Sequence, residues 1–266
     1  QPPAMIDIHH HCLPGVDDGP RELEDAVALC RMAAEEGIET IIATPHVLRG
    51  RWPALTKSEL ETRIVRLRNA VGSTPRLVLG SEYFFGHDMA DVLQGGSAIV
   101  PLAGSRYVLF ELAANTVPPM LEQPLYRVQL DGWVPIVAHP ERNTVYQSHP
   151  DLLARLIRHG VRVQVTATSL TGAFGSQARA AAETFLRRGM VHFIATDAHN
   201  VDKRPPRIKE ALEVLRELAG DEATEALTRT NPLAVVENRG LPWEPEPREA
   251  RDGGLLTRLR SFLNSR

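Results

Sequence analysis

Short apolar runs alternate with longer amphipathic stretches along most of the chain. The runs are rich in Ile, Val and Leu and contain few polar residues, which is typical of parallel strands that are buried on both faces. We predict seven such strands, at residues 6–8, 40–43, 77–79, 107–110, 135–138, 161–165 and 191–195.

The stretches between these runs carry apolar side chains at helical spacing, and glycines such as Gly37, Gly160 and Gly189 follow several of them as stop signals. Thr56 and Glu59 form the pattern of a capping box at the start of one stretch. We predict helices at residues 20–36, 56–71, 120–130, 152–159, 178–188, 208–218 and 222–228.

Seven short strands that alternate with helices predict an α/β fold with a parallel sheet, and the strand count favours a distorted (β/α)7 TIM-like barrel. An open, doubly wound sheet would show the same alternation and is the alternative. We assign residues 5–240 to the barrel. Residues 1–4 precede a native-looking start at Met5 and are interpreted as a cloning remnant.

The last residues differ in composition from the barrel. Residues 241–254 are rich in proline and charge and predict a linker, and residues 255–263 predict a short amphipathic helix. We expect this helix to dock on the barrel or on a neighbouring subunit. Peripheral contact with a membrane surface or a partner kinase is the alternative.

Composition excludes several classes of protein. The 266 residues are 43% hydrophobic and carry a formal net charge of −3, so we expect no nucleic-acid partner. No apolar run approaches the length of a transmembrane helix. The chain has two cysteines, Cys12 and Cys30, which do not form a disulfide framework and favour a cytoplasmic location.

Six of the seven predicted strands have a His, Asp or Glu at or just beyond the carboxyl end. In a parallel barrel these ends meet on one face, where active sites lie. Five histidines and four carboxylates placed together would be costly to bury without cations. We therefore predict that nine residues bind metal: His9, His11, Asp18, His46, Glu82, Glu111, His139, Asp197 and His199.

This donor set suits Mn, Fe or Zn, and nine ligands are enough for three divalent ions. Such ions hold a bridging hydroxide and clamp the oxygens of a phosphoryl group. Arg142 and Arg204 follow ligand residues closely and are predicted to contact the phosphate. Neither cysteine is followed at the required spacing by an arginine, so a cysteine phosphatase mechanism is excluded. The remaining histidines are assigned structural or surface roles: His10, His87, His149, His159 and His192.

Seven short motifs resemble those of the bacterial protein tyrosine phosphatases of the PHP (polymerase and histidinol phosphatase) superfamily, of the CpsB/CapC/YwqE type. They are residues 7–11 (DIHHH), 16–20 (VDDGP), 44–46 (TPH), 80–82 (GSE), 110–111 (FE), 138–142 (AHPER) and 196–199 (TDAH), in the order of the family. The resemblance covers the chain from Met5 to about Leu241. His10 stands where a small residue is more usual, and Thr196 replaces a common Ser; neither change removes a ligand.

The resemblance implies a three-metal, usually manganese-activated phosphotyrosine-protein phosphatase. Its substrate would be the phosphotyrosine tail of a membrane-associated bacterial tyrosine kinase that controls capsule or exopolysaccharide synthesis. The family pattern would place His9, His11, Glu111 and Asp197 on one ion, Glu82, Glu111 and His139 on a second, and Asp18, His46 and His199 on a third.

Two other functions stay open at this point. A small-molecule phosphoesterase, such as a histidinol-phosphate phosphatase of the same superfamily, would use the same ligands. A barrel that only binds a partner would be expected to lack ligands, whereas every ligand position here is filled. Tyr83, Phe84 and Phe85 could flank the mouth of the site and contact a substrate ring, although core packing is an equal expectation.

Overall fold

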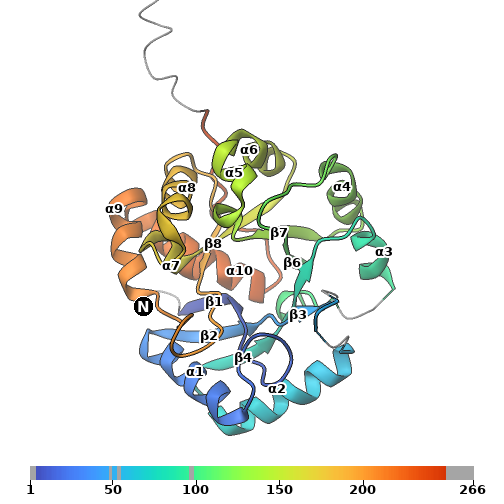
Figure 1. Ribbon diagram of the computed structural model, residues 1–266, viewed down its shortest axis with the longest axis vertical. Coiled ribbons are helices and arrows are strands. Elements are labelled where there is room, and N and C mark those ends of the chain that lie inside the picture. Colours follow the sequence, from blue (N-terminus) through green and yellow to red (C-terminus); the bar gives the residue numbers. More distant parts are fainter. Residues whose placement is uncertain (1–3, 48–49, 53–54, 96–98, 250–266) are drawn as a thin grey trace, which may run out of the picture.

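Parallel strands lie at the centre of the molecule and helices surround them (Figure 1). This arrangement is seen in a computed structural model, which describes residues 4–47, 50–52, 55–95 and 99–249. The described residues form nine strands: β1 (Met5–His10), β2 (Ile38–Ala43), β3 (His46–Val47), β4 (Arg76–Leu79), β5 (Glu82–Phe84), β6 (Tyr107–Glu111), β7 (Val134–Ala138), β8 (Arg162–Thr166) and β9 (Phe193–Ala195).

The strands form two parallel sheets, in the orders β1-β2-β4 and β3-β5-β6-β7-β8-β9. All seven predicted strands are present, but two are followed by a break and a short second strand. Pro45 stands in the break between β2 and β3, where it cannot donate a ladder hydrogen bond. Gly80 stands between β4 and β5, where a Cβ atom would come within 2.8 Å of Leu102 Cδ2.

The end of β1 contacts the segment that follows β9. Asp197 N donates to His9 O at 2.8 Å, and His11 N donates to Ala198 O at 2.9 Å. The first and last strands therefore lie side by side at their carboxyl ends, and β1 also pairs with β2 along its length.

Most predicted helices are present within a few residues of the expected bounds. Thr56 and Glu59 form the expected capping box, with Glu59 N donating to Thr56 Oγ1 at 3.3 Å and Thr56 N donating to Glu59 Oε2 at 2.7 Å. The α-helices of the described residues are α1 (Leu23–Glu35), α2 (Lys57–Val71), α3 (Met89–Gln94), α4 (Glu122–Leu130), α5 (Thr144–Ser148), α6 (Pro150–Arg158), α7 (Ala167–Leu170), α8 (Gly175–Arg187), α9 (Lys209–Glu225) and α10 (Asn231–Val236).

The two helices predicted at residues 208–218 and 222–228 are joined in α9, which is interrupted at Gly220 (φ 85°, ψ 172°). A π-helical turn at Ala226–Thr230 then leads into α10. Four short helices, α3, α5, α7 and α10, were not predicted.

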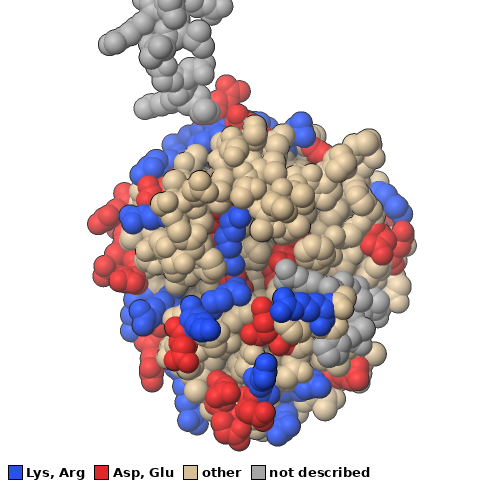
Figure 2. Space-filling view, in the orientation of Figure 1, with Lys and Arg blue, Asp and Glu red and all other residues tan. Residues whose placement is uncertain are grey.

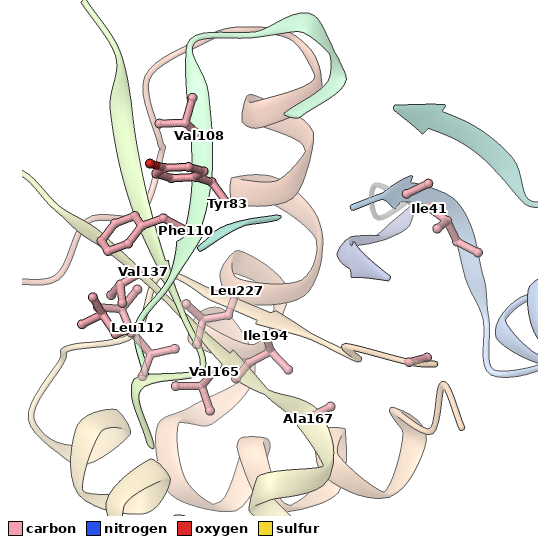
Figure 3. Close-up of a cluster of buried hydrophobic side chains, with 14 of the residues drawn as sticks. Ile41, Tyr83, Val108, Phe110, Leu112, Val137, Val165, Ala167, Ile194 and Leu227 are labelled. Carbon is pink, nitrogen blue, oxygen red and sulfur yellow. The ribbon is translucent and has the colours of Figure 1, made fainter. Parts of the chain in front are cut away.

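The hydrophobic core lies on both faces of the sheets. One cluster packs between the strands and the helices and contains Val108, Phe110 and Val137 (Figure 3). A second cluster contains the alternate residues of the same strands, Leu109 and Ile136 among them. Strands such as β6 and β7 are buried on both faces, and their sequences are almost entirely apolar, as the pattern predicted.

The part of the predicted linker that the structure describes, residues 241–249, contacts the body of the protein. Asn231 Nδ2 donates to Trp243 O at 2.8 Å, and Arg248 N donates to Arg188 O at 2.8 Å. The predicted helix at residues 255–263 lies outside the described residues, as do residues 1–3 of the interpreted cloning remnant. No helix in the described ranges combines the length and apolar character that crossing a bilayer would require.

Candidate metal centre

The site begins with two histidines at the end of β1, each held through its Nδ1 atom. His9 Nδ1 lies 2.9 Å from Gln164 Oε1, and His11 Nδ1 lies 2.7 Å from Asp17 Oδ2. These contacts direct both Nε2 atoms to the same point, where they are 3.1 Å apart. Metal-binding histidines show this arrangement, in which the second ring nitrogen donates to an oxygen acceptor.

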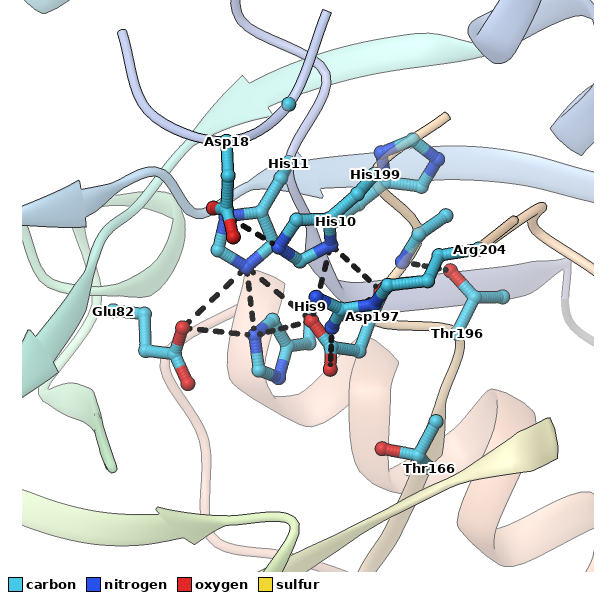
Figure 4. Close-up of polar contacts among 12 residues, drawn as sticks. His9, His10, His11, Asp18, Glu82, Thr166, Thr196, Asp197, His199 and Arg204 are labelled. Carbon is cyan, nitrogen blue, oxygen red and sulfur yellow. Dashed lines mark hydrogen bonds and ion pairs between the residues drawn. The ribbon is translucent and has the colours of Figure 1, made fainter. Parts of the chain in front are cut away.

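Two carboxylates adjoin the histidine pair (Figure 4). Glu82 Oε2 lies 3.3 Å from His9 Nε2 and 3.4 Å from His11 Nε2, and Asp197 Oδ1 lies 3.3 Å from each of the same nitrogens. Two ligands about 2.1 Å from one ion lie about 3.0 Å apart at a right angle and about 3.4 Å apart at the tetrahedral angle. The spacing of these four atoms is therefore that of neighbouring ligands on one metal ion.

Glu82 also joins this group to a second one. The pairing of β3 with β5 places His46 opposite Glu82, so His46 Nδ1 lies 3.0 Å from Glu82 Oε2. The other carboxylate oxygen, Oε1, lies 2.9 Å from His139 Nε2, directly after β7. Glu111, the last residue of β6, brings its Oε1 atom 3.2 Å from His46 Nδ1. The glutamate beside His9 and His11 is thus Glu82, where the family pattern implies Glu111.

A third group lies on the outer side of the site. Asp18 Oδ1 is 3.3 Å from His199 Nε2 and 3.5 Å from His46 Nε2. The His11 ring stacks on His199 at a centroid distance of 3.9 Å, which connects this group to the first.

All nine predicted residues fall into overlapping groups whose nitrogen and oxygen atoms lie within 4.8 Å of one another. Seven of the nine are buried, His139 is partly exposed and Asp18 is exposed. Within the described ranges, the five histidines given structural or surface roles enter none of these groups: His10, His87, His149, His159 and His192.

The electrostatics of the site fit divalent cations. Burial alone would raise the pKa of Glu82, but His9 and His46 outweigh it and hold that pKa well below its usual range. Burial would lower the pKa of His46, and the Glu82 carboxylate instead raises it to about 9. Without cations, the carboxylates therefore favour protons on His9, His11 and His46, and metal ions would replace those protons.

Several of the atoms that could bind a metal ion have no hydrogen-bond partner among the described residues. Glu82 Oε2, Asp197 Oδ1 and His199 Nε2 are buried and make no hydrogen bond there. Buried polar atoms are rarely left in this state, and metal ligation would satisfy all three. The residues present therefore fit divalent metal ions.

Two of the nine residues have backbones in the left-handed region. His139 has φ 35° and Asp197 has φ 52°. Non-glycine residues rarely adopt this conformation, which here occurs within two residues of the ends of β7 and β9. His139 N is fixed there by a hydrogen bond to Gln164 O at 2.8 Å.

The two predicted arginines border a cavity of about 260 Å³ that also contains six of the nine predicted ligands. Arg142 Nη1 lies 2.7 Å and Arg204 Nη2 lies 2.5 Å from Asp197 Oδ2. Their Nε atoms are buried and donate no hydrogen bond to any described residue. Figure 2 shows acidic and basic side chains meeting in a hollow near the centre of this face.

The residues that orient the site were not predicted from the sequence. Asp17, which holds His11, stands next to Asp18 in an acidic pair that could have indicated a second role. Gln164 and Thr166 lie on β8, which has no His, Asp or Glu at its end, so no sequence signal marked them. Asp7 accepts hydrogen bonds from Thr196 N at 3.0 Å and His9 N at 3.3 Å, and burial raises its pKa to about 6.

The aromatic residues after Glu82 do not flank the site. Glu82 points to the metal centre, and because side chains alternate along a strand, Tyr83 points to the opposite side. Tyr83 is 3% exposed and belongs to the core, with its hydroxyl donating to Asp88 Oδ1 at 3.1 Å. Phe85 packs against the same core, and none of residues 83–85 borders the cavity.

Residues 5–237 match the family described as "Capsular polysaccharide synthesis, CpsB/CapC". The chain belongs to the CpsB/CapC family. One CpsB/CapC relative is the tyrosine-protein phosphatase YwqE of Bacillus subtilis, which is 35% identical over 250 residues, 91% of this chain and 96% of YwqE. Another is the tyrosine-protein phosphatase CpsB of Streptococcus pneumoniae, 28% identical over 239 residues, 87% of this chain and 98% of CpsB.

A solved CpsB/CapC structure has a similar fold. It comes from work on YwqE of B. subtilis and CpsB of S. pneumoniae, described as unique metal-dependent tyrosine phosphatases, and superposes with a TM-score of 0.87 at 33% identity, covering 92% of this chain and 100% of the other. An Escherichia coli phosphotriesterase homology protein superposes with a TM-score of 0.57 at 12% identity, covering 87% and 98%, and shares the fold alone.

Proposed function

We propose that this protein is a metal-dependent phosphotyrosine-protein phosphatase. One observation carries the proposal: nine candidate metal ligands lie in overlapping groups, and six of them line one cavity together with two arginines that have unused buried donors. Its relatives YwqE and CpsB are named as tyrosine-protein phosphatases, and the solved relatives are described as metal-dependent.

We assign the nine residues to three divalent ions, most readily manganese, with iron or zinc as alternatives. His9, His11, His46 and Glu82 each belong to two of the overlapping groups, so the candidate ligands form one continuous set that would hold the ions side by side. Bound ions would lower the pKa of a water nucleophile and neutralise charge on the phosphoryl oxygens.

The protein's own residues would then bind and orient the phosphate. Arg142 and Arg204 present guanidinium groups to the cavity beside Asp197, and their N–H groups suit the equatorial oxygens of a phosphoryl group. Leu112, Val137 and Pro140 supply apolar surface in the same cavity, which suits the ring of a tyrosyl side chain. Because a phenolate with a pKa near 10 leaves more easily than an alkoxide, a strong general acid is less necessary.

We also propose the wider setting that the family implies. The substrate would be the phosphotyrosine tail of a bacterial tyrosine kinase that controls capsule or exopolysaccharide synthesis, and the phosphatase would act in the cytoplasm. The two sheets would be the two parts of a distorted (β/α)7 barrel, closed where the end of β1 bonds to residues 197–198.

The proposal is tested by metal analysis of the purified protein together with steady-state kinetics on two substrates in the presence of Mn²⁺. We expect bound transition metal and a higher kcat/KM on a phosphotyrosyl peptide than on histidinol phosphate. The reverse preference would assign a small-molecule phosphoesterase. Metal-loaded protein with no phosphate release from either substrate would contradict an enzymatic role.

A further inference from the structure

An aromatic ring outside the predicted site covers one of the two arginines. Phe174 lies between α7 and α8 and is partly buried. The guanidinium carbon of Arg142 is 3.6 Å from the centroid of the Phe174 ring, and that of Arg204 is 5.9 Å away. Both distances lie within the range of cation–π attraction, and the shorter one is a direct stack.

The ring completes the surroundings of Arg142. In the plane of its guanidinium, Nη2 donates to Thr166 Oγ1 at 2.6 Å and Nη1 contacts Asp197 Oδ2 at 2.7 Å. These contacts fix the edge of the guanidinium that faces β8 and the metal centre. The Phe174 ring lies against a face of the guanidinium and keeps the guanidinium from tilting out of this plane.

The ring also helps two like charges to approach each other. Arg142 and Arg204 both contact Asp197 Oδ2, so two cations share one carboxylate oxygen. The negative potential above an aromatic face attracts a cation and offsets part of this repulsion. Phe174 also borders a neighbouring cavity of about 280 Å³ with Lys203, Arg204 and Arg207, so the ring is part of the wall beside the phosphate-binding arginines.

We propose that Phe174 is a positioning residue that holds Arg142, and with it Arg204, ready to bind a phosphoryl group. This inference rests on the proposed function of Arg142. It requires an aromatic face at position 174, whereas a role in packing alone requires only apolar volume.

The test compares Phe174→Leu, which keeps apolar volume, with Phe174→Tyr, which keeps the aromatic face, in the full-length Mn²⁺-loaded enzyme. We expect Phe174→Leu to raise KM for a phosphotyrosyl peptide and to weaken inorganic phosphate binding, measured by calorimetry, by about threefold to tenfold. We expect kcat to change by less than about twofold, and Phe174→Tyr to stay within about twofold of the wild type in both measurements. Trp133→Leu, at a partly buried aromatic residue outside both cavities, is the control.

A double-mutant cycle makes the test specific. Arg142→Ala alone should raise KM, and adding Phe174→Leu should then have no further effect on phosphate affinity. Equal losses in Phe174→Leu and Phe174→Tyr, or additive losses in the cycle, would overturn the inference and leave the proposed function intact. If the wild type hydrolyses no phosphotyrosyl peptide, the proposed function fails. In that case inorganic phosphate binding alone tests the inference. An unchanged phosphate affinity in Phe174→Leu, or no phosphate binding by the wild type, would overturn it as well.

Discussion

Asp197 connects the metal-binding side chains to the phosphate-binding ones. Its Oδ1 atom faces His9 and His11, and its Oδ2 atom faces both arginines. Burial would raise its pKa, but His9, Arg142 and Arg204 together hold that pKa well below its usual range. A single carboxylate thus balances positive charge on two sides.

Replacing Asp197 should therefore remove the activity without unfolding the protein. We expect Asp197→Ala to lower kcat/KM on a phosphotyrosyl peptide by about 10³-fold or more, because a metal ligand and the partner of two arginines are lost together. Circular dichroism should show an unchanged fold. Asp202→Ala, at an exposed position in the same loop, is the control and should retain full activity. Full activity in Asp197→Ala would contradict the assignment of the centre.

Gln164 gives a prediction about orientation rather than ligation. Its Oε1 atom lies 2.9 Å from His9 Nδ1, so it fixes which ring nitrogen of His9 faces the metal centre. Gln164→Leu keeps the volume and removes the acceptor. We expect the Mn²⁺ concentration for half-maximal activation to rise by about 10- to 100-fold, with kcat largely restored at saturating metal. Gln177→Leu, at an exposed position on α8, should behave like the wild type.

The nine candidate ligands could be predicted because each stands at a position defined by the strand pattern. The residues that orient them could not, since a glutamine in the middle of β8 or a phenylalanine between two helices has no distinguishing spacing. The sequence also could not predict that Glu82, and not Glu111, lies beside His9 and His11. That arrangement depends on the break after β4, which places Glu82 opposite His46.

At the scale of elements, the turn between β7 and α5 links two sides of the site. Asn143 is 4% exposed, and its Oδ1 accepts from Val145 N at 2.9 Å and Tyr146 N at 3.2 Å at the start of α5. Its Nδ2 donates to Ala113 O at 2.8 Å and Thr116 O at 2.9 Å. Asn143 therefore ties the turn that carries Arg142 to the loop that follows Glu111.

Removing this link should affect stability and activity together. We expect Asn143→Ala to lower the free energy of unfolding by about 2–3 kcal/mol, because buried backbone groups lose their partners. We also expect a reduced kcat/KM as Arg142 loses its support. Ser148→Ala, an exposed position on the same helix, is the control and should change stability little. Urea unfolding and phosphatase assays on the three proteins measure both effects, and a stable but inactive Asn143→Ala would point to a direct role.

The elements that the sequence predicted are those with a long periodic pattern or a capping signal, such as α2 with Thr56. The missed helices α3, α5, α7 and α10 have four to six residues, too few for a helical period to be visible. The break between β2 and β3 follows from Pro45, but the sequence does not reveal that a strand resumes after it. The interruption of α9 at Gly220 lies in the gap between the two helices that the sequence predicted.

At the scale of the whole molecule, metal ions should stabilise the fold. A ligand that binds only the folded state adds about 2.7 kcal/mol at 100 times its Kd. We expect Mn²⁺ to raise Tm by several degrees in a concentration-dependent way and a chelator to lower it. The shift should be much smaller in Asp197→Ala. Differential scanning calorimetry measures both, and equal Tm values with and without metal would contradict a resident metal centre.

His192 gives the protein a source of acid sensitivity far from the metal centre. The ring is 1% exposed, its Nδ1 accepts a hydrogen bond from Val163 N at 3.2 Å, and Arg162 is the nearby charge. Burial, aided by Arg162, lowers the pKa of His192 to about 3. The unfolded chain, in which the pKa would be near 6.5, therefore binds a proton more readily between these two values.

Stability should consequently fall as the pH drops below about 6.5, and His192→Asn should reduce that fall because its amide oxygen can replace the Nδ1 acceptor without titrating. Between pH 7 and pH 4.5 we expect the wild type to lose about 2 kcal/mol more free energy of unfolding than the variant. Urea unfolding of both proteins across this range measures the difference. His149→Asn, at an exposed ring, should follow the wild type. Parallel pH profiles for the wild type and His192→Asn would show that this buried imidazole does not govern the acid response.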